Sequence, residues 1–248
     1  MAHDRSLDPA PCAAAGAFLT TRWSVVVRAG AEECGDALGQ LCRDYWYPLY
    51  AFLRRRGLPV EEAQDVTQGF FLRVIEGDLL ERAREEKGRF RSFLLGALQN
   101  FLANHRRHEQ TQKRGGGVTT LSIDEMQAEQ RFALEPADPL TPEAQFERSW
   151  AFSLLERVCV RLGDDYLAAG RADLFSKLQP YLAGKAQLAG YAELGRELAM
   201  SESAVAVAIH RMRRRYGELL REEIAHTVAD PAEVEDEIVH LMKIVASV

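Results

Sequence analysis

Apolar residues recur at helical spacing along most of this chain. Between residues 38 and 52 they stand at positions 38, 41, 42, 45, 49 and 52, on one face of a helix that ends near Gly57. Pro48 lies inside this helix and is expected to kink or restart it. Further helices are predicted to begin at Pro59, Gly88, Pro142 and Pro231. No run of alternating β-branched residues predicts a strand, so the pattern indicates an all-α protein.

Residues 191–216 predict two short helices separated by a tight break. The first spans 192–199, and Met200, Ser201 and Glu202 form the break, where Ser201 is suited to cap the second helix. The second helix has an apolar stripe of Val205, Ile209, Met212 and Tyr216. Its opposite side carries Ser203, Val207, His210, Arg211 and Arg214, and Arg213 and Arg215 complete a basic cluster. This arrangement is typical of a helix-turn-helix, whose second helix can enter a DNA major groove; the alternative is an ordinary helical hairpin with a solvated basic face.

The charge of the chain is unevenly distributed. The net charge of the 248 residues is −6, which is unusual for a protein that binds nucleic acid. Residues 201–221 nevertheless hold five arginines against two glutamates, a local charge of +3, whereas residues 229–248 hold five acids against one lysine, a local charge of −4. A basic patch is therefore compatible with the acidic total.

The remaining composition argues against several classes of protein. The four cysteines lack metal-ligand or disulfide spacing, the six histidines form no metal motif, and the glycines at 115–117 lack the lysine of a phosphate loop. We therefore expect no catalysis, no cofactor and no metal. No signal peptide and no long apolar segment is present, so we expect a soluble, cytoplasmic protein that does not contact a membrane.

The helix predicted from Gly88 interleaves aromatic residues with arginine and asparagine. Such a pattern suits single-stranded or melted nucleic acid, because bases stack on aromatic rings and their edges are bound by amides. The polar residues that could make these contacts are Arg89, Arg91, Asn100, Asn104, Arg106 and Arg107. The alternative is that the phenylalanines belong to the core and the arginines are solvated.

Three stretches resemble, in order, the second conserved region of bacterial RNA polymerase sigma factors of the extracytoplasmic-function (ECF) class. They are YWYPLYAFLRRR at 45–56, EEAQDVTQGFF at 61–71 and GRFRSFLLGALQNFLANHRR at 88–107. The family has Tyr-Pro-x-Leu-Tyr, Ala-x-Asp-Leu-Thr-Gln-Glu-x-Phe and Gly-x-Phe-x-x-Trp-Leu helices in this order, followed by a helix-turn-helix. Gly69 stands where the family usually has Glu, and Phe93 where it often has Trp.

The resemblance implies partners and roles. Gln64, Asp65 and Gln68 would dock on the clamp helices of the polymerase β′ subunit. The first domain would open the downstream promoter element and capture a base in the loop 77–87, while the helix-turn-helix would bind the upstream element and its domain the β flap. The second helix has alanine and valine at 204–208 where sigma factors commonly have Thr-Val-Lys-Ser-Arg, so base reading would fall on Ser203, His210 and the arginines, with Val207 against a thymine methyl group. An anti-sigma factor or another regulator is a further candidate partner.

The domain organisation that follows is two small helical domains joined by a flexible linker. The segments are a disordered leader (1–17), a region 2-like domain (18–108), a flexible acidic linker (109–141), a region 4-like helix-turn-helix domain (142–228) and an acidic C-terminal extension (229–248). Val234, Ile238, Leu241 and Val245 form one stripe in the extension, which we expect to pack on a domain or contact a partner. Two other functions stay open, a stand-alone helix-turn-helix regulator and a helical adaptor whose arginines meet acidic protein.

Overall fold

A computed structural model describes residues 35–76, 89–111, 125–134, 140–183, 190–228 and 230–246 of the chain. Every regular element in these ranges is helical, which confirms the all-α prediction. In order they are α2 (Gly35–Arg55), α3 (Val60–Ile75), α5 (Phe90–Thr111), α6 (Glu125–Leu134), α7 (Pro142–Ala168), α8 (Ala172–Leu178), η1 (Gln179–Ala183), α9 (Tyr191–Leu198), α10 (Glu202–Ala225), η2 (Pro231–Glu233) and α11 (Val234–Ala246). The predicted leader 1–17 and the loop 77–87 lie outside the described residues.

Helix α2 is the centre around which the first half of the chain packs. Leu49 and Phe52 are completely buried, and burial of a leucine or phenylalanine side chain contributes about 1.5–3 kcal/mol. The helix continues through Pro48, so the predicted restart does not occur. It ends at Arg55, ahead of Gly57, whose φ of +86° is one that residues with a Cβ atom rarely adopt.

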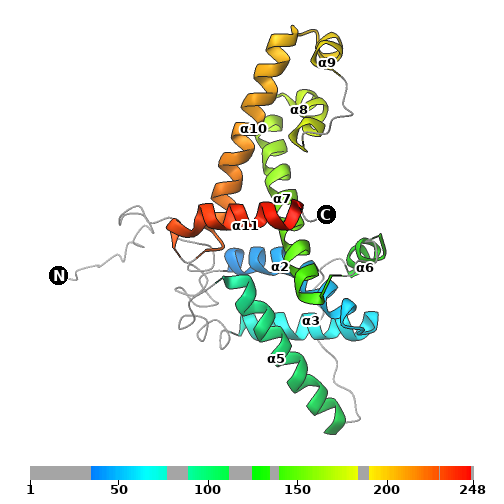
Figure 1. The fold of residues 1–248 in the computed structure, drawn as a ribbon. Helices are drawn as coiled ribbons and strands as arrows, with labels where there is room; N and C mark the ends of the chain where they lie inside the picture. Colours follow the sequence, from blue (N-terminus) through cyan, green and yellow to red (C-terminus); the bar gives the residue numbers. More distant parts are fainter. Residues whose placement is uncertain are drawn as a thin grey trace, which may run out of the picture.

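Helices α3 and α5 complete this half on the side of α2 away from α10 (Figure 1). The predicted stripe of α3 is confirmed, since Ala63, Val66, Phe70 and Val74 are all buried. Gly69 faces α5, where a Cβ atom would lie 3.3 Å from the Phe101 ring. The glycine that departs from the sigma-factor pattern therefore permits a close approach of the two helices.

Helix α7 joins the two halves of the chain into one core. Phe146 and Trp150 are buried, and the rings of Phe52 and Phe146 lie 6.4 Å apart in an edge-on arrangement. The Arg157 guanidinium lies 3.2 Å from the Asp44 carboxylate of α2. The sequence assigned α7 to a separate second domain, whereas the structure packs it along α2.

Helix α6 lies within the segment for which the sequence predicts a flexible linker. Its Glu129 forms an ion pair of 3.1 Å with Arg54 of α2 and accepts a short hydrogen bond from the Tyr50 hydroxyl. Burial opposes ionisation of Glu129, but the hydrogen bonds from Arg54 and Tyr50 outweigh it and lower the pKa of this carboxyl group. The Phe132 ring lies under the Arg54 guanidinium, 5.1 Å from ring centroid to guanidinium carbon. At least ten residues of the linker thus form a helix docked on α2.

Helices α7 and α10 run side by side away from α2, with α8 and α9 near the far end of the pair (Figure 1). Helix α11 lies across them near α2. Its Leu241 is completely buried, and the other three residues of its predicted stripe are partly buried against the core. The expectation that the C-terminal extension packs on a domain is confirmed.

Candidate nucleic-acid and polymerase interface

The turn between α9 and α10 is closely constrained. Its first residue, Ala199, adopts the left-handed conformation with φ 52° and ψ 40°, and the Met200 amide donates a 2.8 Å hydrogen bond to the Gly195 carbonyl. The Ser201 hydroxyl caps α10 by accepting a 3.2 Å hydrogen bond from the Ala204 amide, as the sequence predicts. The break begins one residue earlier than expected. The turn therefore constrains the orientation of α10 relative to α9.

Gly195 makes this turn possible. A Cβ atom at this position would lie 2.7 Å from the Met200 carbonyl oxygen, which is closer than two such atoms approach. No local pattern in the sequence indicates this role, because the contact forms only when the turn folds back on the last turn of α9.

Helix α10 has one buried side and one exposed side. Val205, Ile209 and Met212 are buried, as the apolar stripe predicts. The side chains of Ser203, Val207, His210, Arg211, Arg213 and Arg214 are exposed. Val207 has 48% of its surface exposed and lies on the same side of the helix as these polar residues.

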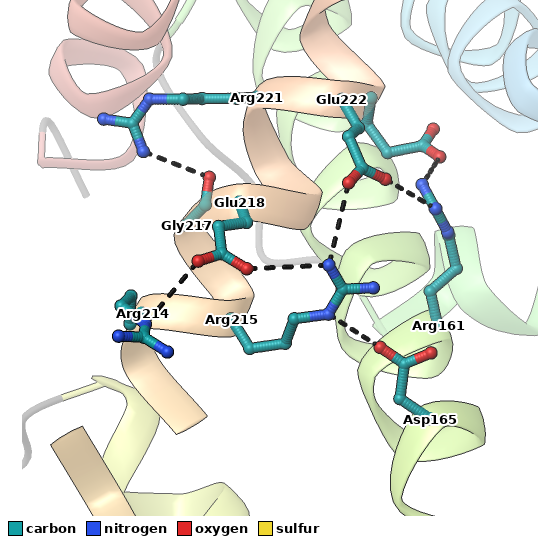
Figure 2. A network of polar contacts seen from close by, with 9 residues as sticks. Arg161, Asp165, Arg214, Arg215, Gly217, Glu218, Arg221 and Glu222 are labelled. Atoms are coloured by element: carbon teal, nitrogen blue, oxygen red, sulfur yellow. Dashed lines mark hydrogen bonds and ion pairs between the residues drawn. The ribbon is translucent and has the colours of Figure 1, made fainter. Parts of the chain in front are cut away.

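Two of the predicted DNA-binding arginines are engaged within the protein. Arg213 donates hydrogen bonds of 2.6 and 3.1 Å to the Tyr181 carbonyl of η1. Arg215 donates a 2.8 Å hydrogen bond to Asp165 of α7, which raises the pKa of its guanidinium, and it also lies near Glu218 and Glu222. Figure 2 shows Arg215 at the centre of this network. Arg213 and Arg215 therefore tie α10 to its neighbours.

Arg211 and Arg214 extend from the exposed side of α10. Arg214 lies 3.6 Å from Glu218, one turn further along the helix (Figure 2), with both side chains largely exposed. Such a surface pair contributes about 0.3–0.5 kcal/mol and can exchange for a phosphate. His210, Arg211 and Arg214 thus lie on the exposed side of α10, where an external anion can reach them.

Helices α7 and α10 are further joined by a cluster around Glu223. This carboxylate is buried and accepts a 2.6 Å hydrogen bond from Arg161, and the Arg157 guanidinium lies 3.9 Å from it. Arg161 also binds Glu222 at 2.9 Å (Figure 2). Because Arg157 contacts Asp44 as well, one chain of charges links α2 through α7 to α10.

The polar residues of α5 divide into two groups. Asn100, Asn104, Arg106 and Arg107 are exposed on its C-terminal half, which projects from the body of the protein (Figure 1). Arg91, near its N-terminus, has only 1% of its side chain exposed. It forms ion pairs with Glu147 at 2.6 Å and with Glu237, and its guanidinium lies 4.0 Å from the Trp150 ring.

Arg89 lies beside this buried cluster and is partly exposed. Its guanidinium forms a 2.9 Å ion pair with Glu237. In this arrangement Arg91 cannot touch nucleic acid, contrary to the expectation from sequence, and Arg89 is partly occupied. The sequence could not reveal this, because Glu237 lies 146 positions further along the chain than Arg91.

The three residues of α3 expected to bind the polymerase do not share one surface. Asp65 is exposed and Gln64 is half-buried. Gln68 is only 6% exposed and belongs to the buried side of the helix. Helix α3 packs against both α2 and α5, so its buried arc is wider than a single apolar stripe suggests. Asp65 and Gln64 are accessible to a partner, and Gln68 is not.

Neither a metal-binding cluster nor a membrane-spanning helix occurs in the described part of the chain. These residues contain no group of three or more His, Cys, Asp or Glu side chains that could hold a metal ion. None of the described helices combines the length and apolar character needed to cross a membrane.

Comparison with protein-family models, with curated proteins and with solved structures finds no match to this chain.

Proposed function

We propose that this chain is a sigma factor of the ECF class, which directs RNA polymerase to promoters and catalyses no reaction itself. The observation that carries the proposal is the outward side of α10. A helix whose opposite side is buried presents His210, Arg211 and Arg214 together with Ser203 and Val207. These are the properties a recognition helix needs in a major groove. The resemblance of the stretches in α2, α3 and α5 to sigma-factor motifs, in the same order, supports the assignment to the ECF class.

In this proposal α10 reads the upstream promoter element. Arg211 and Arg214 contact phosphates or guanine edges, His210 and Ser203 donate or accept hydrogen bonds, and Val207 contacts a thymine methyl group. Arg213 and Arg215 act indirectly by holding the helix in place. The phosphate contacts dominate the affinity, so binding weakens steeply with salt.

The exposed end of α5 contacts the melted strand in this proposal. Asn100 and Asn104 can pair with base edges, while Arg106 and Arg107 neutralise phosphates. Asp65 and Gln64 of α3 form the accessible part of the contact with the β′ clamp helices. The second half of the chain would bind the β flap. A protein with this role works in the cytoplasm.

One observation favours a second function, a stand-alone helix-turn-helix regulator. The outward side of α10 is open, whereas Arg91 of α5 is covered by α11. A duplex could therefore bind α10 while the N-terminal part of α5 takes no part.

Transcription by purified core RNA polymerase from a pool of genomic fragments separates the two functions. A sigma factor produces defined start sites that disappear when the chain is omitted. DNA binding by the chain alone, with no start sites in the presence of core polymerase, would instead support the regulator and overturn the sigma proposal.

The polymerase contact is tested with a pair of matched variants. Asp65→Ala is expected to weaken core binding about tenfold, which corresponds to roughly 1.4 kcal/mol, because it removes an exposed carboxylate from the proposed docking surface. Glu76→Ala removes another exposed carboxylate, at the C-terminal end of α3, and should leave core affinity unchanged. Equal affinities of the two variants in a pull-down titration would refute the assignment of Asp65.

A further inference from the structure

The C-terminal helix α11 places a buried carboxylate on the nucleic-acid helix α5. Glu237 has only 2% of its side chain exposed, and it forms ion pairs with both Arg89 and Arg91. A buried carboxylate is stable only when it is paired, because removing the charge from water is expensive. The position of α11 is therefore specific, because the Glu237 carboxylate is stable in this buried place only while it contacts the two arginines.

Both arginines that Glu237 binds belong to the motif GRFR at residues 88–91, at the start of the proposed nucleic-acid helix. The local cluster contains two arginines, Arg89 and Arg91, and two glutamates, Glu147 and Glu237. It is balanced while α11 is in place. When α11 leaves, the two arginines face Glu147 alone, and the cluster carries one net positive charge.

Helix α11 is held at this position by contacts of moderate strength. Leu241 is buried, Arg221 pairs with Glu235 at 2.9 Å, and the His240 ring lies 3.4 Å from Glu147. The helix has 13 residues, so only a short element has to move. It belongs to an acidic stretch, since residues 229–248 hold five acids against one lysine.

We propose that α11 is an inhibitory helix, which covers Arg89 and Arg91 with the Glu237 carboxylate until nucleic-acid phosphate displaces it. The proposal rests on the proposed function, because it takes α5 as a nucleic-acid surface. The exchange replaces one anion by another on the same two guanidinium groups, so the arginines are paired before and after it. Nucleic acid thus binds α5 in competition with α11.

The test uses the full chain and a short, fluorescently labelled single-stranded DNA of mixed sequence. Glu237→Gln removes the buried carboxylate and is expected to bind this DNA more tightly than wild type. Its affinity should also fall more steeply with salt, by about 0.7 in the slope of log K against log salt for each arginine released. Asp236→Asn removes an exposed carboxylate from the same helix and should match wild type. Equal affinities and slopes for the two variants would overturn the proposal.

A second measurement needs no variant, so it stands even where Glu237→Gln lowers stability. Amide hydrogen exchange of residues 234–246 in the wild-type chain should accelerate when the single-stranded DNA is added. Unchanged protection of these amides at saturating DNA would overturn the proposal. Neither measurement uses polymerase, so an inhibitory α11 in a chain that gives no start sites would refute the sigma function alone.

Discussion

The turn between α9 and α10 allows a direct test of the structure, through two glycines that are each changed to alanine. Gly195 lies in the last turn of α9 and Gly217 in the interior of α10. In a helix, alanine is more favourable than glycine by about 0.8–1.0 kcal/mol. By helix propensity alone, both substitutions should stabilise the protein.

The atoms around Gly195 reverse this expected stabilisation, whereas those around Gly217 do not. At Gly217 the nearest atom to an added Cβ is a guanidinium nitrogen of Arg221 at 3.5 Å, an ordinary contact with a flexible side chain. At Gly195 it is the Met200 carbonyl oxygen at 2.7 Å, so the backbone of the turn must move. Forced overpacking of this kind destabilises by about 1–3 kcal/mol.

Gly217→Ala is therefore expected to raise the free energy of unfolding by about 0.5–1 kcal/mol. Gly195→Ala should lower it by about 0.5–2 kcal/mol, because the overpacking exceeds the gain in propensity. Urea denaturation of the two variants beside wild type, followed by circular dichroism, measures both changes. If Gly195→Ala were as stable as Gly217→Ala, the close approach of Gly195 to Met200 would be wrong.

Two further outcomes are expected. Arg213→Ala should lower the free energy of unfolding by about 1 kcal/mol, because it removes the hydrogen bonds to the Tyr181 carbonyl. Arg211→Ala should leave stability unchanged, but it should reduce the slope of log K against log salt for duplex DNA binding by about 0.9. Thermal melting measures the first effect and anisotropy titrations the second, and the reverse pattern would contradict both roles. Burial raises the pKa of the Cys42 thiol from 9.0 to about 11, so the thiol of the unfolded chain loses its proton at a lower pH than that of the folded chain. The contribution of this protonated thiol to the free energy of unfolding is therefore complete below pH 9.0 and is lost as the pH rises to about 11. Cys42→Ala should flatten that alkaline decline in urea denaturation, and an equally steep decline in the variant would count against the buried thiol as its cause.

Local pattern was sufficient to predict the second helix of the 191–216 stretch and its buried side. Val205, Ile209 and Met212 are predicted to be buried from their spacing alone, and all three are. The cap at Ser201 likewise depends on residues within one turn of it. Such features follow from the sequence because the groups that interact are close together in it.

The roles of charged residues could not be predicted in the same way. Arg91 and Arg213 look like surface arginines in the sequence, yet one binds Glu237 of α11 and the other the Tyr181 carbonyl of η1. Their partners lie 146 and 32 positions away. Only the folded arrangement of the helices decides whether an arginine meets water, a carboxylate or a carbonyl.

The contacts between the predicted segments could not be predicted for a related physical reason. The acids and prolines of residues 109–141 are typical of a tether, but Glu129 and Phe132 find partners on α2 and hold α6 against it. Similarly, the stripe of α7 predicts a helix with a buried side without indicating what covers it. Helix α7 packs against both α2 and α10, and the sequence of one helix does not show which other helices pack against it.

Two movements of the helices differ in how much buried apolar surface they expose. Separating α7 from α2 would expose Phe146, Trp150 and Leu154, all of which are buried, and at about 1.5–3 kcal/mol for each side chain this amounts to roughly 5–9 kcal/mol. Moving α11 exposes one completely buried apolar side chain, Leu241, and three partly buried ones. A nanomolar complex supplies about 12 kcal/mol, which exceeds the cost of separating α7 from α2. Release of α11 therefore exposes less apolar surface than separation of α7 from α2, and the two movements are separable.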